Sequence, residues 1–233
     1  MILVFRFRMS HRDSFRRIST TWFRRISIGW FSVAHRFLCC CATASQRDSV
    51  KGMNTEAATP DARYPIGKFE RPPYLSAEQR CAGTQSIAEL PKKLRHAVDG
   101  LYEWQLDTPY RDGGWTLRQT IHHVADSHMQ AVGRIRLALT EDWPNIIPYQ
   151  EKLWAELPDV ITEPIEPSLQ LLEGLHRRWA GLLRSLPQPA WIERGYIHPE
   201  LGKQTLEQVA ALYAWHGRHH TAHINTLCER MGW

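Results

Sequence analysis

The chain has 233 residues, 43% of them hydrophobic and 23% charged, which is ordinary for a globular protein with one sizeable domain, or one domain and a tail. Its formal net charge of +5 is unevenly spread: residues 1–52 carry ten Lys and Arg against two Asp and Glu (+8), and residues 53–233 carry nineteen against twenty-two (−3). A mildly acidic body argues against nucleic-acid binding, and no stretch approaches the ~20 apolar residues of a membrane helix.

The first 52 residues form a leader rich in Arg, Ser and aromatic residues, for which three interpretations stay open. Arg24 and Arg25 precede an apolar run, and the segment ATAS could be a cleavage site, as in a targeting segment. His35 and Arg36 interrupt that run, whereas Met53 begins a stretch like an ordinary protein start, so the start codon could be mis-assigned. A functional arm is the third interpretation. We expect residues 1–52 to be no part of the fold.

The cysteines are divided between the leader and the body. Cys39, Cys40 and Cys41 lie in the leader, which leaves Cys81 and Cys228 in the body, without CxxC spacing. Two cysteines make no disulfide framework. We therefore expect a reducing, cytoplasmic location.

The body is predicted to be helical after an extended lead-in at residues 53–75, where Pro65, Pro72 and Pro73 prevent a helix. Residues 76–233 show helical periodicity and no convincing strand pattern. The first predicted helix covers residues 76–106, with Pro91 kinking or splitting it. The second begins at residue 116, the third spans 168–186, and the last runs from residue 205 almost to the end.

Two capping boxes mark helix starts, TLRQ at Thr116 to Gln119 and TLEQ at Thr205 to Gln208. Four long amphipathic helices predict an all-α protein, a single four-helix bundle over residues 76–233. The long Pro-containing connection between the second and third helices indicates that neighbours in space do not simply follow sequence order there.

Four of the twelve histidines fall within WHGRHHTAHI, residues 215–224: His216, His219, His220 and His223. At about 100° per residue they share the face that carries the helix's apolar stripe, so they should be buried. Buried imidazoles need partners, either backbone and carboxylate groups or a metal ion, and the number on one face favours the metal. His216 and His220 form an HxxxH pair, whose side chains project side by side. Gly217 stands where zinc peptidases of the HExxH type have their catalytic Glu, which argues against that activity.

A third ligand must come from another segment, and the second helix offers His122, His123 and His128 in IHHVADSH. Periodicity predicts that His128 points inward and that His123 lies on a polar face. His176 and His198 are interpreted as ordinary surface or loop residues.

Four segments resemble the YfiT-type branch of the DinB/YfiT superfamily: YPIGKFE, LDTPYRDGGWTLRQTIHHVADSHMQ, IIPYQEKLWAEL and YAWHGRHHTAHINTLCERMGW. The resemblance covers most of residues 64–233. It implies a four-helix bundle in up-down-down-up order, a homodimer, and a metal-dependent hydrolase with a divalent metal held by three histidines. The family's first ligand precedes an aliphatic residue and Ala-Asp, which implies His123 here and conflicts with the inward position of His128. The HxxxH pair, His216 and His220, supplies the other two.

Such a site permits more than one chemistry. Three imidazoles leave an open position, where zinc, or nickel or another transition metal, could activate water toward a small-molecule substrate. The alternatives are a thiol S-transferase of the bacillithiol type and a structural metal in a dimeric binding module, which a fourth protein ligand would indicate.

We expect His219, His223 and Asp126 to orient the ligands, and Trp115, Tyr213 and Trp215 to line a pocket.

Overall fold

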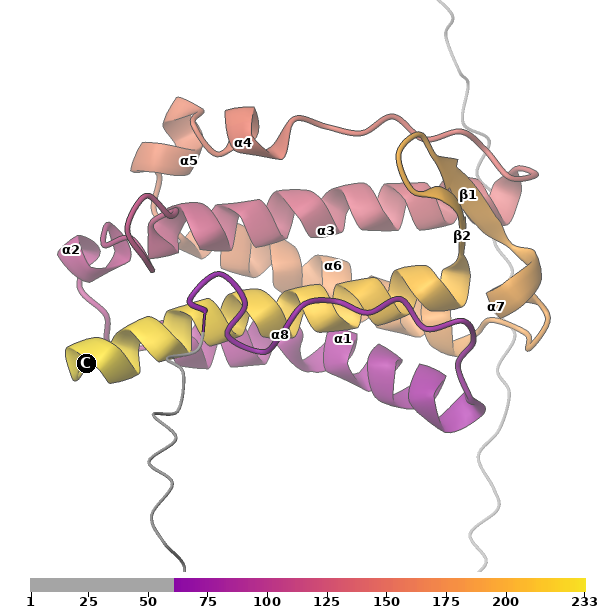
Figure 1. The fold of residues 1–233 in the computed structure, drawn as a ribbon, viewed down its shortest axis with the longest axis horizontal. Helices are drawn as coiled ribbons and strands as arrows, with labels where there is room; N and C mark the ends of the chain where they lie inside the picture. Colours follow the sequence, from indigo (N-terminus) through magenta and orange to yellow (C-terminus); the bar gives the residue numbers. More distant parts are fainter. Residues whose placement is uncertain (1–60) are drawn as a thin grey trace, which may run out of the picture. The chain divides into compact units, whose positions relative to one another are not determined.

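A computed structural model describes residues 61–233; the expectations for residues 1–60, including the leader, lie outside the described residues. Four long helices dominate it, α1 (Ala77–Ala97), α3 (Leu117–Thr140), α6 (Glu166–Arg184) and α8 (Leu206–Met231) (Figure 1). The shorter elements between them are α2 (Glu103–Leu106), α4 (Glu151–Trp154), α5 (Pro158–Thr162), α7 (Ala190–Glu193), β1 (Gly195–His198) and β2 (Gly202–Thr205).

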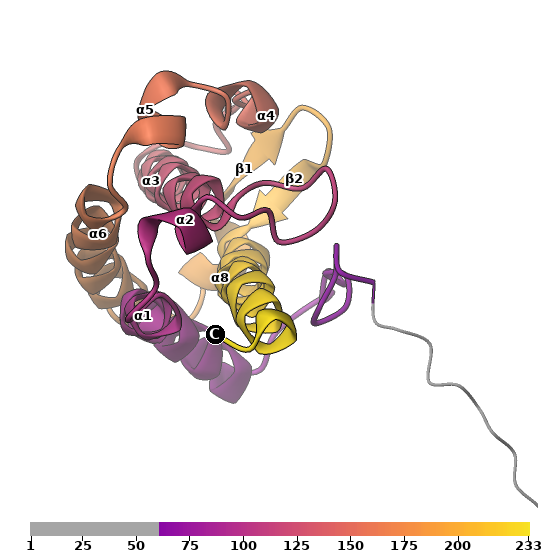
Figure 2. The ribbon, with the colours of Figure 1, turned by 90° about the vertical axis from the view of Figure 1, so that its left-hand side faces the viewer.

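The four long helices form a bundle in which α1 and α3 lie on a diagonal, and α6 and α8 each contact both (Figures 1 and 2). Along the bundle, α1 and α8 run in one direction and α3 and α6 in the other (Figure 1). This is the up-down-down-up order that the resemblance implies. The neighbours α3 and α6 are parallel, so the chain needs a long return between them, and residues 141–165 provide it with α4 and α5.

Capping boxes begin three of the four long helices. The predicted boxes at Thr116 and Thr205 are both present; Gln119 N–H donates to Thr116 Oγ1 at 3.1 Å, and Thr116 N–H donates to Gln119 Oε1 at 2.9 Å. A third box, Ser76 with Gln79, begins α1. It has the same sequence pattern, S-x-x-Q, and could have been found the same way.

Two sequence predictions about secondary structure are wrong. α1 continues through Pro91 to Ala97, and the break comes later, near Gly100, which adopts a left-handed φ of 78°. Because Pro91 has no N–H, the carbonyl oxygen of Ile87 has no hydrogen-bond donor from its own helix. An antiparallel hairpin, β1 with β2, also stands where no strands were predicted, because two four-residue strands are too short for a clear alternating pattern.

The lead-in, residues 61–75 of which are described, forms no helix, as its prolines predicted, and it runs along α8 (Figure 1). Glu207 accepts from the Leu75 N–H at 3.3 Å and from Arg80, and Gln208 donates to the Pro72 carbonyl at 3.4 Å. The lead-in is thereby fixed to the start of α8 by side chains of α8 itself.

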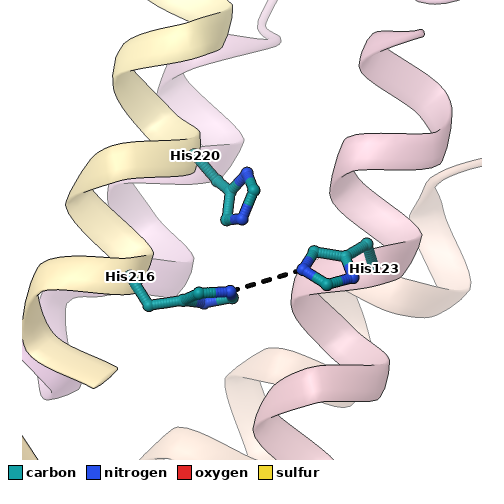
Figure 3. A group of neighbouring side chains, drawn as sticks. All are labelled: His123, His216 and His220. Atoms are coloured by element: carbon teal, nitrogen blue, oxygen red, sulfur yellow. Dashed lines mark hydrogen bonds between the residues drawn. The ribbon is translucent and has the colours of Figure 1, made fainter. Parts of the chain in front are cut away.

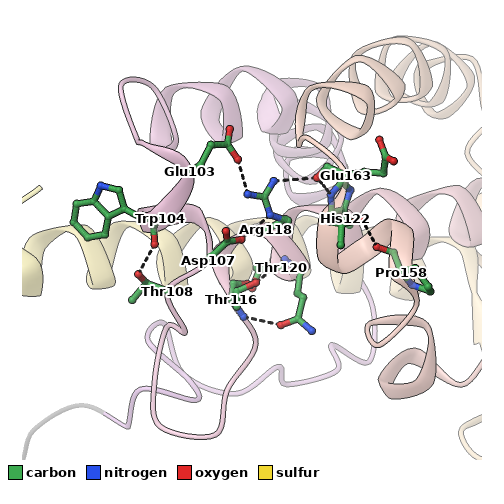
Figure 4. Close-up of polar contacts among 12 residues, drawn as sticks. Glu103, Trp104, Asp107, Thr108, Thr116, Arg118, Thr120, His122, Pro158 and Glu163 are labelled. Carbon is green, nitrogen blue, oxygen red and sulfur yellow. Dashed lines mark hydrogen bonds and ion pairs between the residues drawn. The ribbon is translucent and has the colours of Figure 1, made fainter.

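A buried arginine joins α3 to its flanking segments (Figure 4). The guanidinium of Arg118, only 4% exposed, donates to Asp107 at 2.7 Å, to the carboxylate of Glu103 and to the backbone carbonyl of Glu163 at 3.0 Å. His122 also bonds to that carbonyl, at 3.2 Å. This cation has both carboxylate and backbone partners, as a buried charge requires.

Gly217 of α8 packs directly against Leu90 of α1. A Cβ there would lie 2.6 Å from Leu90 Cδ2, and Leu90 is buried. A larger side chain at this position, such as the Glu of the HExxH motif, would therefore collide with α1.

Within the part of the chain that the structure describes, no helix is both long and apolar enough to cross a membrane.

Gly217→Ala should lower the free energy of unfolding by about 1–3 kcal/mol, because the added methyl overpacks the α1–α8 contact. The matched control is Gly174→Ala on α6, where a Cβ meets no atom within 4 Å; it should raise stability by about 0.5–1 kcal/mol through helix propensity. Urea unfolding of both variants measures the difference. Equal stabilisation by both substitutions would contradict the close-contact explanation.

Candidate metal centre

Three histidines from two helices converge in the bundle, His123 of α3 with His216 and His220 of α8 (Figure 3). One ring nitrogen of each lies within 4.8 Å of the other two. His123 Nε2 and His216 Nε2 are 3.3 Å apart. The structure thus brings together the three residues that the resemblance named.

Burial keeps these imidazoles neutral. It lowers the pKa of His123 to about 4, with a smaller contribution from the neighbouring His219. Burial also lowers the pKa of His216 and His220 well below the ordinary value, and the crowding of other imidazoles adds to the effect. The neutral ring is the form that binds a metal. At neutral pH the cluster therefore needs no proton loss to bind a cation.

A chain of hydrogen bonds runs from His216 through the core to a backbone carbonyl. His216 Nδ1 is 3.0 Å from His128 Nε2, His128 Nδ1 is 2.9 Å from His176 Nε2, and His176 Nδ1 is 2.6 Å from the Ile87 oxygen. That oxygen is free for this bond because Pro91, one helical turn later, has no N–H to donate to it.

The carbonyl at the end of this chain fixes the tautomers of all three rings. A carbonyl oxygen can only accept, so His176 carries its proton on Nδ1 and accepts on Nε2. His128 must then donate from Nδ1 and accept on Nε2, and His216 must donate from Nδ1. The Nε2 of His216 is left with a free lone pair directed at His123. The hydrogen bonds of the protein alone therefore direct an unprotonated nitrogen of His216 at the cluster.

A shorter chain supports His220. Its Nδ1 is 3.4 Å from His223 Nδ1, and His223 Nε2 is 3.3 Å from the carbonyl oxygen of Arg63. The same donor logic leaves Nε2 of His220 free, through longer and weaker bonds. The carbonyl of Arg63 is thus the one backbone group that the lead-in contributes to this chain. Tyr110 stacks on His223 at 4.0 Å between ring centroids.

The structure confirms the position predicted for one histidine and contradicts the positions predicted for two others. His128 points inward and is fully buried, as periodicity predicted. The interpretation of His176 as a surface or loop residue is wrong, because it is fully buried in α6 as the middle of the chain described above. His198 lies on β1. The polar-face expectation for His123 is also wrong: that face is covered, with the Trp115 ring 4.7 Å away.

The other expected contributors lie around the cluster. His219 stacks on Trp215 at 4.4 Å, and its Nδ1 has no partner within residues 61–233. His219, His220 and His223 form a second group whose nitrogens lie within 4.8 Å. Burial, with the charge of Asp159 added, raises the pKa of Asp126 to about 6, and no hydrogen bond in the described chain joins Asp126 to these rings.

Two clefts reach the cluster from different sides. The Arg134 cleft, about 480 Å³, is lined by Ser127, Arg134, Tyr149, Tyr196, Tyr213 and His216, among others. The Trp115 cleft, about 580 Å³, is lined by Trp115, Tyr64, Tyr110, His219, His220 and His223, among others. Glu151 and Lys152 of α4 line both. A small molecule could therefore meet the histidines from either side of α4.

Nitrogen NMR of the metal-free protein should show His216, His128 and His176 protonated on Nδ1, because the Ile87 carbonyl fixes the direction of every donor. Exposed His96 serves as the control, since water allows its two tautomers to exchange. His128→Gln should preserve the His216 tautomer, because an amide can accept from one ring and donate to the other, whereas His128→Phe should release it. A proton on Nε2 of His128 in the wild-type protein would contradict the chain.

The chain is similar to known proteins in sequence and, for one solved structure, in fold. A relative from Bacillus mycoides (strain KBAB4), named "Putative metal-dependent hydrolase BcerKBAB4_2443", is 51% identical over 173 residues, which are 74% of this chain and 99% of the relative. A relative from Bacillus cereus (strain 03BB102), with the name "Putative metal-dependent hydrolase", is 50% identical over the same shares. A solved structure described as "YfiT from Bacillus subtilis is a probable metal-dependent hydrolase with an unusual four-helix bundle topology" aligns with a TM-score of 0.72 and 48% identity, covering 74% of this chain and 98% of that one. The family model of the DinB superfamily matches residues 86–224, and the chain belongs to that family.

Proposed function

We propose that this protein is a metal-dependent hydrolase whose divalent metal, zinc in the first instance, is held by His123, His216 and His220. The observation that carries the proposal is the convergence of three neutral imidazoles, with one ring nitrogen of each within 4.8 Å of the others. When bound at such a site, the metal lowers the pKa of a bound water to about 7 and polarises a carbonyl oxygen.

The donor geometry fits a zinc-sized ion. Two nitrogens, each about 2.0–2.1 Å from a tetrahedral ion, lie about 3.3 Å from one another. His123 Nε2 and His216 Nε2 are 3.3 Å apart. In addition, the chain through His128 and His176 holds His216 in the tautomer that a metal ligand requires, as partners behind metal ligands commonly do.

The number of donors favours a reactive metal over a structural one. The group around His123 has three members among residues 61–233, whereas structural zinc sites normally have four protein ligands. His223, the strongest candidate for a fourth, is hydrogen-bonded to the Arg63 carbonyl through Nε2 and directed at Nδ1 of His220. Both clefts give a substrate access to the remaining position. Homodimer formation, which the resemblance implies, stays a prediction.

Replacing any of the three histidines by Ala should reduce bound metal from stoichiometric to background, because two imidazoles seldom retain a divalent ion. His96→Ala, at an exposed position on α1, is the matched control and should keep full metal content. Elemental analysis after tag-free purification gives the result, with circular dichroism to show that the helices remain. Full metal content in His216→Ala would contradict the assignment.

Zinc-loaded protein should hydrolyse activated esters or amides without any added thiol, and chelation should stop the turnover. The same preparation would then receive an electrophile with cysteine, glutathione or bacillithiol in turn. Turnover that requires a thiol would replace the hydrolase with an S-transferase at the same site. If zinc is bound and neither reaction occurs in a broad panel, the structural-metal alternative is favoured.

A further inference from the structure

We propose that the Arg134 cleft binds a carboxylate of the substrate, with the guanidinium of Arg134 as the anion-binding group. This inference rests on the proposed function for the position of the reacting bond. It adds the chemical class of the substrate: a small molecule that carries an anionic end away from the bond that is broken.

Arg134 is a buried cation with few partners. The residue is only 9% exposed; its Nη2 donates to the Ile147 carbonyl at 3.1 Å, and the hydroxyl of Tyr213 also lies near its guanidinium. The Nε atom is buried and has no acceptor among residues 61–233. No ion pair of Arg134 occurs in that part of the chain, although the residue lines an open cleft.

Two other arginines with side chains at comparable depth do have carboxylates. On the same helix, Arg118 pairs with Glu103 and Asp107. On α1, Arg80 pairs with Glu207 at 3.1 Å. A guanidinium out of water without an anion loses much of its solvation, and a planar carboxylate matches its fork of donors. A ligand that enters the cleft can supply to Arg134 the carboxylate that the protein itself supplies to Arg118 and Arg80.

A second donor of this kind lies in the cleft. The hydroxyl of Tyr149 belongs to the same cleft lining and is buried close to Ser127, without a well-formed hydrogen bond within the described chain. Burial raises the pKa of Tyr149, so this hydroxyl keeps its proton and can only gain by donating to an acceptor. Two such donors, one charged and one neutral, favour an oxygen anion.

The charges around the cleft limit the anion to a small negative charge. Lys152 adds a second cation, while exposed Glu151 and Glu200 offset both. Burial, together with the charge of Arg134, lowers the pKa of His198, which is neutral at physiological pH. A monoanionic carboxylate leaves a balance of −1, whereas a phosphate dianion leaves −2. The carboxylate is therefore the better match.

The separation between Arg134 and the histidines sets the length of the substrate. Burial raises the pKa of Tyr213, and Arg134 is close enough to that hydroxyl to oppose the effect. The Tyr213 ring in turn lies 5.7 Å from the ring of His216, between centroids. Arg134, Tyr213 and His216 line the same cleft, so a substrate whose carboxylate meets Arg134 can extend past Tyr213 and present its reacting bond at His216.

The test uses glutarate, a dicarboxylate, and its neutral diamide glutaramide as probes of the full-length, zinc-loaded protein. Addition of glutarate should shift the side-chain Nε–H resonance of Arg134, and glutaramide should leave it unchanged. Arg134→Gln should weaken glutarate binding roughly ten- to hundred-fold, the usual effect of losing a charged hydrogen-bonding partner. Arg136→Gln, at an exposed position two residues along α3, is the matched control and should bind as the wild type does.

The resonance in the wild-type protein tests the proposal even if Arg134→Gln fails to fold, and Arg134→Lys, which keeps the charge, should retain part of the affinity. Repeating the titration after chelation separates the two proposals. Binding at Arg134 that persists without metal supports the cleft assignment, even where no hydrolysis is found. Equal binding of glutarate and glutaramide, or equal affinities of the Arg134→Gln and Arg136→Gln variants, would overturn it.

Discussion

The carbonyl oxygen of Ile87 is the fixed acceptor on which the order of the buried histidines depends. It is available because Pro91, inside an unbroken helix, cannot donate to it. From that oxygen, each hydrogen bond determines the next, through His176 and His128, until a lone pair on His216 faces His123. A proline that normally weakens a helix here provides an acceptor that no ordinary helical residue could offer at that place.

Beside its hydrophobic core, this bundle buries a group of histidines, and such polar groups are tolerated only when nearly every one has a partner. The two chains of histidines end on backbone carbonyls, one in α1 and one in the lead-in. Five separate segments, the four long helices and the lead-in, are therefore joined through the site. Among the buried donors without a well-formed hydrogen bond in the described chain, Arg134 and Tyr149 belong to residues that line a cleft.

Sequence patterns were sufficient for the parts of the structure that depend on local chemistry. The capping boxes at Thr116 and Thr205 and the inward position of His128 followed from residue type and periodicity. The roles of His176 and Pro91 did not, because they depend on one contact between α1 and α6 that no local pattern encodes. His123 was misplaced by periodicity because a helical count assumes one buried face, whereas Trp115 from the preceding loop covers a second. The hairpin was missed because its strands are only four residues long.

The parallel arrangement of α3 and α6 has a consequence for how new specificities could arise. If successive helices alternated in direction, a short turn could join α3 to α6. The chain would then lack the connection that lines the Arg134 cleft with Pro148, Tyr149, Glu151 and Lys152. The helices that hold the imidazoles and the connection that lines the cleft are thus separate stretches of polypeptide. Insertions or exchanges in that crossover can reshape the entrance while the helical frame and its reactive centre remain intact.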